Sequence, residues 1–122
     1  MAPAILVVDD ESTTRRLVHY VLKPLGVDVL EAGDPEETMA IVENNVVEMI
    51  LMDINLPRMN GFDLTVRLRA MEKLKDVPIL IFTARSHPND AKRALESGAV
   101  GFLYKPFSTT ELRQIVTKYV RL

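Results

Sequence analysis

The sequence places acidic, hydroxyl and basic side chains where short apolar runs end. Two adjacent carboxylates, Asp9 and Asp10, follow the first run, and a third, Asp53, follows a later one. Thr83 closes another run, and Lys105 comes directly after the last. If these residues meet, they offer oxygen ligands for a metal ion, a carboxylate nucleophile, a hydroxyl donor and one positive charge.

Three carboxylates that lie close together repel one another, so the folded protein needs positive charge among them. Lys105 supplies one charge, and a hard divalent cation supplies the rest. Oxygen ligands without histidine or cysteine favour Mg²⁺, or Mn²⁺, over zinc. Beside such a metal, Asp53 is a candidate nucleophile toward phosphorus, and the product would be an aspartyl phosphate. The metal and Lys105 would neutralise the phosphoryl oxygens, and Thr83 would donate a hydrogen bond to one of them.

Each member of this set also has an ordinary structural explanation. An aspartate at a strand end is often the N-cap of the next helix, and for Asp10 alone that explanation is as good as the metal-ligand one. A threonine that closes a buried strand is usually structural, and a lysine before proline usually lies on the surface. The prediction therefore depends on the joint placement of the set at four strand ends.

Five short apolar runs, most of them continuously apolar, organise the chain. They are Ala4–Val8, Val27–Leu30, Val46–Met52, Val77–Phe82 and Val100–Tyr104. Such runs are typical of strands buried on both faces of a parallel sheet. Because the carboxyl ends of parallel strands share one edge of a sheet, the polar residues that follow these runs should converge there.

Helical patterns separate the apolar runs. One stripe at helical spacing consists of Leu17, Val18, Val21, Leu22 and Leu25, and another consists of Leu112, Ile115, Val116 and Tyr119. Strand and helix thus alternate five times, and with right-handed crossovers this predicts an α/β fold, an open parallel sheet with helices on both faces.

Short polar signals mark the helix ends. Helices are predicted to begin at Asp34-Pro35-Glu36-Glu37 and, through a capping box, at Ser108-Thr109-Thr110-Glu111. Pro88 is placed to open the fourth helix. Two glycines, Gly26 and Gly98, lie where helices should stop.

Length and composition fit one ordinary domain. The chain has 122 residues, of which 48% are hydrophobic and 26% charged, with a net charge of −2 and no cysteine. Neither a nucleic-acid nor a membrane surface is indicated, and no apolar run reaches the ~20 residues of a membrane span. Disulfide and thiolate chemistry are excluded, and the start lacks a signal-peptide pattern. We expect a cytoplasmic domain over residues 1–122 with no output domain.

The remaining candidates are interpreted as structural. His19 and His87 have no nucleophile or carboxylate pair beside them in the sequence that would make them catalytic. The six methionines fit core positions. Asn60-Gly61 is interpreted as a turn, and there is no Gly-rich phosphate loop.

In combination, four segments resemble the response-regulator receiver domains of two-component signalling, over essentially the whole chain. They are Leu6–Glu11, Met52–Gly61, Phe82–Arg85 and Gly98–Phe107. The resemblance implies a flavodoxin-like (βα)5 fold with strand order 2-1-3-4-5. It also implies a signalling switch that promotes only its own phosphorylation and dephosphorylation, rather than an enzyme. The implied donor is a sensor histidine kinase or a histidine phosphotransfer protein.

The resemblance assigns the metal and phosphoryl site residue by residue. Asp53 matches the phosphoacceptor. Asp9 and Asp10 match the acidic pair that holds Mg²⁺, with Asp10 usually the direct ligand. Asn55 matches the position that offers a backbone carbonyl to the metal, and Lys105 matches the phosphate-contacting lysine.

The resemblance also assigns a switch. Thr83 matches the switch hydroxyl and Phe102 the switch aromatic, and the Lys105-Pro106 bond is expected to be cis. Inward movement of Thr83 would let Phe102 rotate into the vacated space, and the signal would leave through the fourth helix, fifth strand and fifth helix. The affected surface would include Lys92, Arg93, Glu96, Glu111 and Lys118.

One departure concerns dimerisation. Members that dimerise to drive winged-helix DNA-binding domains often carry Asp-Asp-Tyr after Gly-Ala, whereas the matching residues here are Val100-Gly101-Phe102. The acids that support the salt-bridged dimer of those members are therefore missing.

Other classes of protein remain open alternatives. A metal-dependent phosphohydrolase with an aspartyl-phosphate intermediate would need an acid or base two residues after the acceptor, and Asn55 cannot relay a proton. A flavin-binding protein of the same strand order would favour hydroxyl- and glycine-rich phosphate loops over an acidic cluster. A degenerate receiver that acts only as an interaction module would not need the full set of acids, hydroxyl and lysine.

Overall fold

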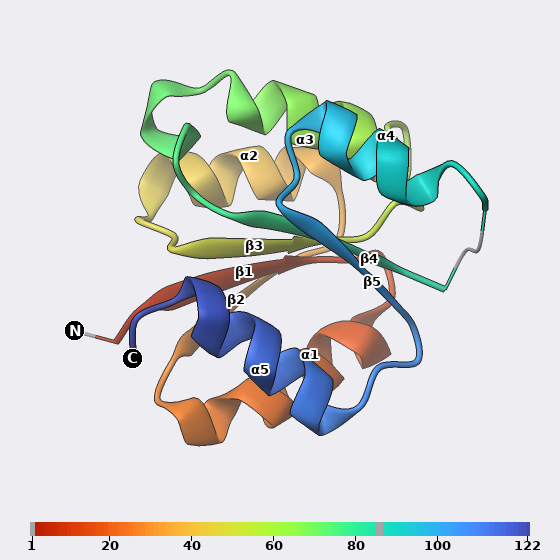
Figure 1. The fold of residues 1–122 in the computed structure, drawn as a ribbon. Coiled ribbons are helices and arrows are strands. Elements are labelled where there is room, and N and C mark those ends of the chain that lie inside the picture. The colour runs from red at the N-terminus through yellow and green to blue at the C-terminus, as the bar shows by residue number, and fades with distance from the viewer. Residues whose placement is uncertain (1, 85–86) are drawn as a thin grey trace.

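Five parallel strands form one sheet in the computed structural model, which describes residues 2–84 and 87–122. The strands are β1 (Ala4–Val8), β2 (Asp28–Ala32), β3 (Met49–Met52), β4 (Ile79–Thr83) and β5 (Gly101–Tyr104). Their order in the sheet is β2-β1-β3-β4-β5, and every pairing is parallel (Figure 1). The predicted α/β class and strand order are confirmed.

Helices cover both faces of the sheet. The helices α1 (Ser12–Leu22) and α5 (Thr109–Tyr119) lie on one face, and α2 (Pro35–Asn44), α3 (Gly61–Arg69) and α4 (Asp90–Ser97) lie on the other (Figure 1). Two short 3₁₀ helices, η1 (Lys23–Leu25) and η2 (Glu72–Leu74), follow α1 and α3. The result is a three-layer molecule with the sheet in the middle.

The strands divide their side chains between two apolar cores. Leu6 and Val8 of β1 join the core under α2, α3 and α4, whereas Ile5 and Val7 join the core under α1 and α5. Successive side chains of a strand point to opposite faces, so a strand between two helical layers must be apolar at every position. This explains the continuous apolar runs of the sequence.

The position of each strand in the sheet decides how far this pattern extends. Every residue of β1 after Ala4, and every residue of β3 and β4, is buried. The edge strands β2 and β5 are mostly half-buried or exposed. Burial on both faces was therefore predicted correctly for the central strands and wrongly for the edges. The third strand also begins at Met49 rather than Val46, whose side chain is 79% exposed.

Two helix predictions are corrected. Leu17 was placed in the apolar stripe of the first helix, but its side chain is 51% exposed, since the face that α1 buries runs through Val18, Val21 and Leu22. Pro88 does not open the fourth helix. That helix begins at Asp90, after the N-cap residue Asn89, so Pro88 lies in the preceding turn.

The other helix signals agree with the structure. Asp34 caps α2 by accepting a hydrogen bond from the Glu37 amide, with Pro35 in the first turn. Ser108 and Glu111 form the predicted capping box of α5. Two glycines with positive φ end helices, Gly26 after η1 and Gly98 after α4. Within the described residues, no helix is long and apolar enough to span a membrane.

Candidate functional site

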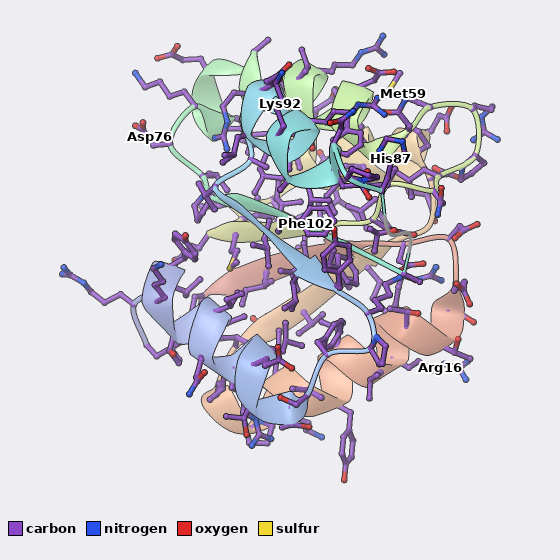
Figure 2. The ribbon with its side chains drawn as sticks, turned by 45° about the vertical axis from the view of Figure 1, so that its right-hand side comes forward. Arg16, Met59, Asp76, His87, Lys92 and Phe102 are labelled. Atoms are coloured by element: carbon purple, nitrogen blue, oxygen red, sulfur yellow. The ribbon has the colours of Figure 1, made fainter. Side chains whose placement is uncertain are left out.

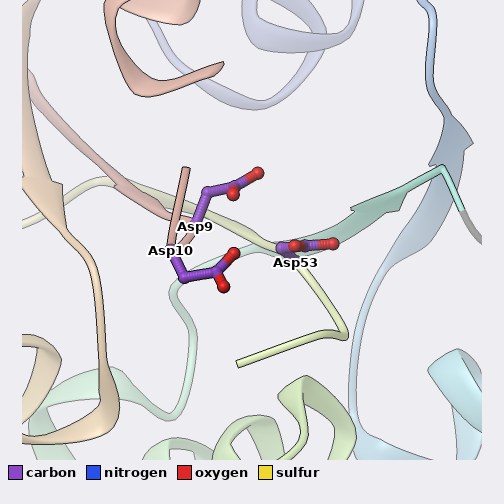
Figure 3. Close-up of side chains that lie close together, drawn as sticks. All are labelled: Asp9, Asp10 and Asp53. Carbon is purple, nitrogen blue, oxygen red and sulfur yellow. The ribbon is translucent and has the colours of Figure 1, made fainter. Parts of the chain in front are cut away.

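Three carboxylates meet at the carboxyl edge of the sheet. Asp9 and Asp10 follow β1, Asp53 follows β3, and one carboxylate oxygen from each lies within 4.8 Å of the others (Figure 3). Asp9 and Asp53 are buried, and Asp10 is exposed to solvent. The convergence predicted from the strand ends is confirmed.

The backbone ladder holds these residues in place because it continues past the ends of the strands. The Asp9 amide donates to the Ala32 carbonyl at 3.0 Å, and the Asp53 amide donates to the Val8 carbonyl at 2.9 Å. The Lys105 amide likewise donates to the Thr83 carbonyl at 2.9 Å. Each side chain therefore starts from a backbone position that the sheet itself sets.

Lys105 brings a positive charge into the cluster. Its Nζ donates to Asp9 Oδ2 at 2.5 Å and lies 3.8 Å from Asp53 Oδ2. The ammonium also lies over the ring of Phe82, 4.7 Å from its centroid. Its side chain is only 15% exposed, so the charge is directed at the acids rather than at bulk water. The Lys105-Pro106 bond is cis, as predicted.

Burial makes Asp53 the unusual acid of the cluster. Desolvation, and then repulsion by the Asp9 carboxylate, raise its pKa from 3.8 to about 6. Three favourable contacts oppose that rise: the charge of Lys105, a hydrogen bond with the Thr83 side chain and a hydrogen bond from the Ile54 amide at 2.9 Å. At neutral pH without metal, Asp53 is mostly ionised but poorly stabilised, so it gains from any added cation.

The donor set fits Mg²⁺. At full ionisation, three carboxylates and one ammonium leave two uncompensated negative charges, which a divalent cation would balance. All three acids offer oxygen, the ligand atom that Mg²⁺ prefers, and the exposure of Asp10 leaves room for the water molecules that Mg²⁺ usually retains.

The other predicted residues lie around this cluster. Thr83 is fully buried at the end of β4, and Asn55 is exposed in the loop after Asp53. Phe102 on β5 (Figure 2) is half-buried against the core under α4. Its ring meets that of Tyr104 edge-on at a centroid distance of 4.5 Å. Arg85, part of the third matching segment, lies outside the described residues.

Gly61 belongs to the site, although the sequence analysis placed it in a turn. It is the first residue of α3, capped by the Asn60 side chain, and its amide donates to the Ile54 carbonyl at 2.8 Å. A Cβ atom at Gly61 would lie 2.0 Å from the Asp53 carbonyl oxygen. The absence of a side chain is what allows α3 to begin against the backbone of Asp53, and Asn60 in the N-cap position was the signal for it.

Arg15 was not among the site residues predicted from the sequence. This α1 residue donates from Nη1 to the Asp9 backbone carbonyl at 2.6 Å and from Nε to Glu31 Oε1 at 3.1 Å. Its position in the helix directly after the acidic pair was the only signal available, because Glu31 is distant in the sequence.

Comparison with known proteins decides the family. A family model described as the response regulator receiver domain matches residues 5–117. The chain belongs to this family. The resemblance inferred from four short segments is thus confirmed over nearly the whole chain.

The chain spans most of some relatives and only a small part of others. The chain is 35% identical to the chemotaxis protein CheY-3 of Vibrio cholerae over 93% of this chain and 88% of that protein. It is 33% identical to the sensor histidine kinase CheAY of Helicobacter pylori over 97% of this chain, but it spans only 15% of that kinase.

Solved receivers have the same fold. One is the receiver domain of a sensor histidine kinase from Pseudomonas aeruginosa, solved with a magnesium ion coordinated in its active-site cleft. It is 30% identical to this chain, with a TM-score of 0.87 and 98% of each chain covered. Membership of the receiver family supports phosphorylation-dependent signalling, and the acidic cluster of this receiver fits Mg²⁺.

Proposed function

We propose that this receiver is a switch that accepts a phosphoryl group on Asp53 and signals by changing one surface. The observation that carries the assignment is the environment of Asp53. This acid is buried between Asp9 and Lys105, and its Oδ2 lies 3.8 Å from the Lys105 ammonium.

The other two acids suit other roles. Both carboxylate oxygens of Asp9 already accept hydrogen bonds, Oδ1 from the Glu11 amide at 2.9 Å and Oδ2 from Lys105 at 2.5 Å. Asp10 faces solvent, where a carboxylate is well hydrated and a weak nucleophile. Asp53 alone combines burial, a nearby cation and a hydroxyl group, which favours it as the phosphoacceptor.

The transfer is a substitution at phosphorus. An Asp53 carboxylate oxygen forms the new O–P bond, the P–N bond of a phosphohistidine donor breaks, and the histidine nitrogen keeps the electron pair. Lys105 stabilises the negative charge of the transferred group, and the Thr83 hydroxyl donates a hydrogen bond to one of its oxygens. Hydrolysis of the acyl phosphate later returns Asp53 and inorganic phosphate.

A divalent cation completes the site. Asp10, Asp53 and the Asn55 backbone carbonyl would hold Mg²⁺, with Asp9 supporting the site through Lys105 and through its negative charge. Mn²⁺ prefers similar oxygen ligands and should substitute. When bound, the metal neutralises charge between the carboxylates and the incoming phosphoryl group. The magnesium-bound receiver from Pseudomonas aeruginosa supports this assignment.

The donor and the compartment follow from the family. We infer a sensor histidine kinase or a histidine phosphotransfer protein as donor, and the kinase among the relatives supports this choice. Such donors act in the cytoplasm, which is where we place this receiver. We expect it to contact neither nucleic acid nor membrane directly.

Labelling by a small phosphodonor tests the proposal. After incubation with acetyl phosphate and Mg²⁺, intact mass should rise by one phosphoryl group in the wild-type protein. The Asp53→Asn variant should gain none, while Asp28→Asn, which removes an exposed carboxylate at the start of β2, should label normally. Excess EDTA should abolish labelling in every variant, because bare carboxylates repel the donor phosphate. Wild-type labelling of Asp53→Asn would contradict the assignment.

A further inference from the structure

Arg15 lies behind the acidic cluster and does not touch any of its three carboxylates. Its side chain is only 19% exposed, although it lies in the first turn of a surface helix. Its guanidinium reaches out of α1 toward the carboxyl edge of the sheet, to the backbone of Asp9 and to the side chain of Glu31 on β2. α1 and β2 are thereby joined through the peptide that links Asp9 to Asp10.

This contact completes the hydrogen bonding of Asp9. The Asp9 amide is held by the Ala32 carbonyl, its Oδ1 by the Glu11 amide and its Oδ2 by Lys105. The backbone carbonyl is the remaining polar atom, and the 2.6 Å bond from Arg15 Nη1 holds it. That carbonyl belongs to the Asp9–Asp10 peptide. The orientation of this peptide also sets the direction in which the Asp10 side chain leaves the backbone.

Neighbouring residues keep the guanidinium in this pose. Glu31 accepts from Nε at 3.1 Å, so the charge of Arg15 is matched by an acid outside the cluster. Gly33 makes room on the other side, because a Cβ there would lie 3.2 Å from Arg15 Nη1. A planar guanidinium with fixed donor directions suits this double contact, which a lysine ammonium cannot reproduce with the same geometry.

We propose that Arg15 is a positioning residue of the metal site: by fixing the Asp9–Asp10 peptide, it preorganises both acids for Mg²⁺. This inference rests on the metal site of the proposed function. Hydrogen-bond partners just outside a metal's ligands commonly change its affinity by about 10- to 100-fold when they are removed.

The direction in which Mg²⁺ affinity changes when Arg15 is removed distinguishes a positioning role from a simple effect of its charge. Arg15 carries a positive charge near a cation site, so as a charge alone it weakens Mg²⁺ binding, and its removal would strengthen binding. As a positioning residue it strengthens binding, and its removal weakens it. The two roles therefore predict opposite changes in the same measurement.

The test is calorimetric titration of metal-free protein with MgCl₂. Arg15→Ala should bind Mg²⁺ at least about 10-fold more weakly than the wild-type protein. Arg16→Ala, which removes the next arginine, an exposed one on α1, should stay within about two-fold (Figure 2). Arg15→Gln gives a second variant that keeps a donor for the Asp9 carbonyl, should the alanine variant not fold, and it should fall between the wild-type protein and Arg15→Ala.

Glu31 supplies an independent check. Glu31→Ala should weaken Mg²⁺ binding both because it releases the guanidinium and because it removes a negative charge. The informative variant is therefore the double one, which should be little worse than Arg15→Ala alone. In metal-free protein, the amide resonance of Asp10 should shift in Arg15→Ala and remain in place in Arg16→Ala.

The outcomes distinguish this inference from the proposed function. A wild-type protein that binds no Mg²⁺ would overturn both. A wild-type protein that binds Mg²⁺, together with an Arg15→Ala variant that binds as tightly or more tightly, would overturn the positioning role alone.

Discussion

At the scale of single residues, the site is a balance between burial and charge. Asp53 is buried beside another acid, which raises its pKa, while Lys105 and two hydrogen-bond donors limit the rise. An ionised carboxylate in this environment is destabilised until a cation or a phosphoryl group changes the balance. Binding of a cation therefore relieves an unfavourable free energy that the ionised acid contributes to the ligand-free protein.

Replacement of Asp53 by asparagine should stabilise the metal-free protein at neutral and higher pH. A raised folded-state pKa, about 6 against 3.8, means that the folded protein favours the protonated acid. Protonated Asp53 therefore stabilises the folded protein. This contribution is fully present below pH 3.8 and is lost as the pH rises through about 6. At pH 8, Asp53→Asn should therefore be more stable by on the order of 1–2 kcal/mol, with allowance for screening, and below pH 4 the gain should shrink.

Urea denaturation in EDTA across this pH range measures the difference. Asp28→Asn, an exposed aspartate at the start of β2, controls for the loss of one negative charge. A stability gain for Asp53→Asn that is the same at pH 4 and pH 8 would show that ionisation of Asp53 is not its source.

A methyl group at Gly61 should disturb the site and the fold together. Since a Cβ there would lie 2.0 Å from the Asp53 carbonyl oxygen, either α3 or the Asp53 backbone must move. We expect Gly61→Ala to lower the free energy of unfolding by about 1–3 kcal/mol and to weaken Mg²⁺ binding.

Gly26→Ala is a matched control for that variant. Gly26 has a φ of 76°, so alanine is strained there, but nothing lies within 4 Å of its Cβ position. It precedes β2 at the amino edge of the parallel sheet, whereas the acids follow the carboxyl ends of the strands. It should lose comparable stability, about 1–2 kcal/mol, and keep its affinity for Mg²⁺. If both glycine variants bind Mg²⁺ like the wild-type protein, Gly61 does not position the site.

At the scale of elements, one arginine ties α3 and α4 together at the end remote from the acids. Arg69 at the end of α3 donates to the Gly98 carbonyl after α4 and to the carbonyls of Leu74 and Val77, at 2.7–2.9 Å for the shortest contacts. Burial lowers the pKa of this guanidinium. Arg69 therefore anchors the carboxyl end of α4 to the end of α3.

Loss of this anchor should destabilise the fold. Arg69→Met keeps the apolar stem but leaves several carbonyls without their donor, and we expect the free energy of unfolding to fall by about 1–3 kcal/mol. Arg67→Met, at an exposed position of the same helix, should change it by less than about 0.5 kcal/mol. Chemical denaturation of both variants measures this, and equal stabilities would refute the anchoring role.

At the scale of the whole molecule, the proposed phosphoacceptor Asp53 follows β3, and only β4 separates that strand from β5 of the proposed output surface. Thr83 ends β4, which pairs with β5, where Phe102 stands opposite Ile81. Figure 2 shows Phe102 on β5 below Lys92 of α4. α4 also contacts α3 through Arg93, whose guanidinium lies 4.4 Å from the ring centroid of Phe62. A shift of Thr83 therefore has a short packed route to α4 and β5.

Beryllofluoride, which mimics the phosphoryl group, should reveal that route. In NMR spectra of the wild-type protein, shift changes should spread from Asp53 to the output surface formed by Lys92, Arg93, Glu96, Phe102, Glu111 and Lys118. Burial of the Phe102 ring gives a few kcal/mol at most, so the two states should exchange rather than lock. Thr83→Ala should shrink the changes beyond the site, and changes confined to the site in the wild-type protein would mean that the signal leaves elsewhere.

The sequence by itself determined the features that depend on neighbouring residues. Continuous apolar runs marked the central strands, and local polar signals marked the capping box at Ser108 and the helix stops at Gly26 and Gly98. Because parallel strands share a carboxyl edge, the sequence alone predicted that the acids, Thr83 and Lys105 lie together. Residue types and their positions at strand ends therefore predicted the chemistry of the candidate site. The strand order came from the family resemblance.

Only the tertiary structure decided features that depend on residues far apart in the sequence. Lys105 and Asp9 are 96 residues apart, so neither their 2.5 Å contact nor the raised pKa of Asp53 follows from local pattern. Leu17 has the spacing of a buried residue but is exposed, since burial depends on what packs over a helix face. Gly61 and Arg15 were missed for the same reason. Their roles come from the backbones of Asp53 and Asp9, and a backbone contact leaves no trace in the type of the residue contacted.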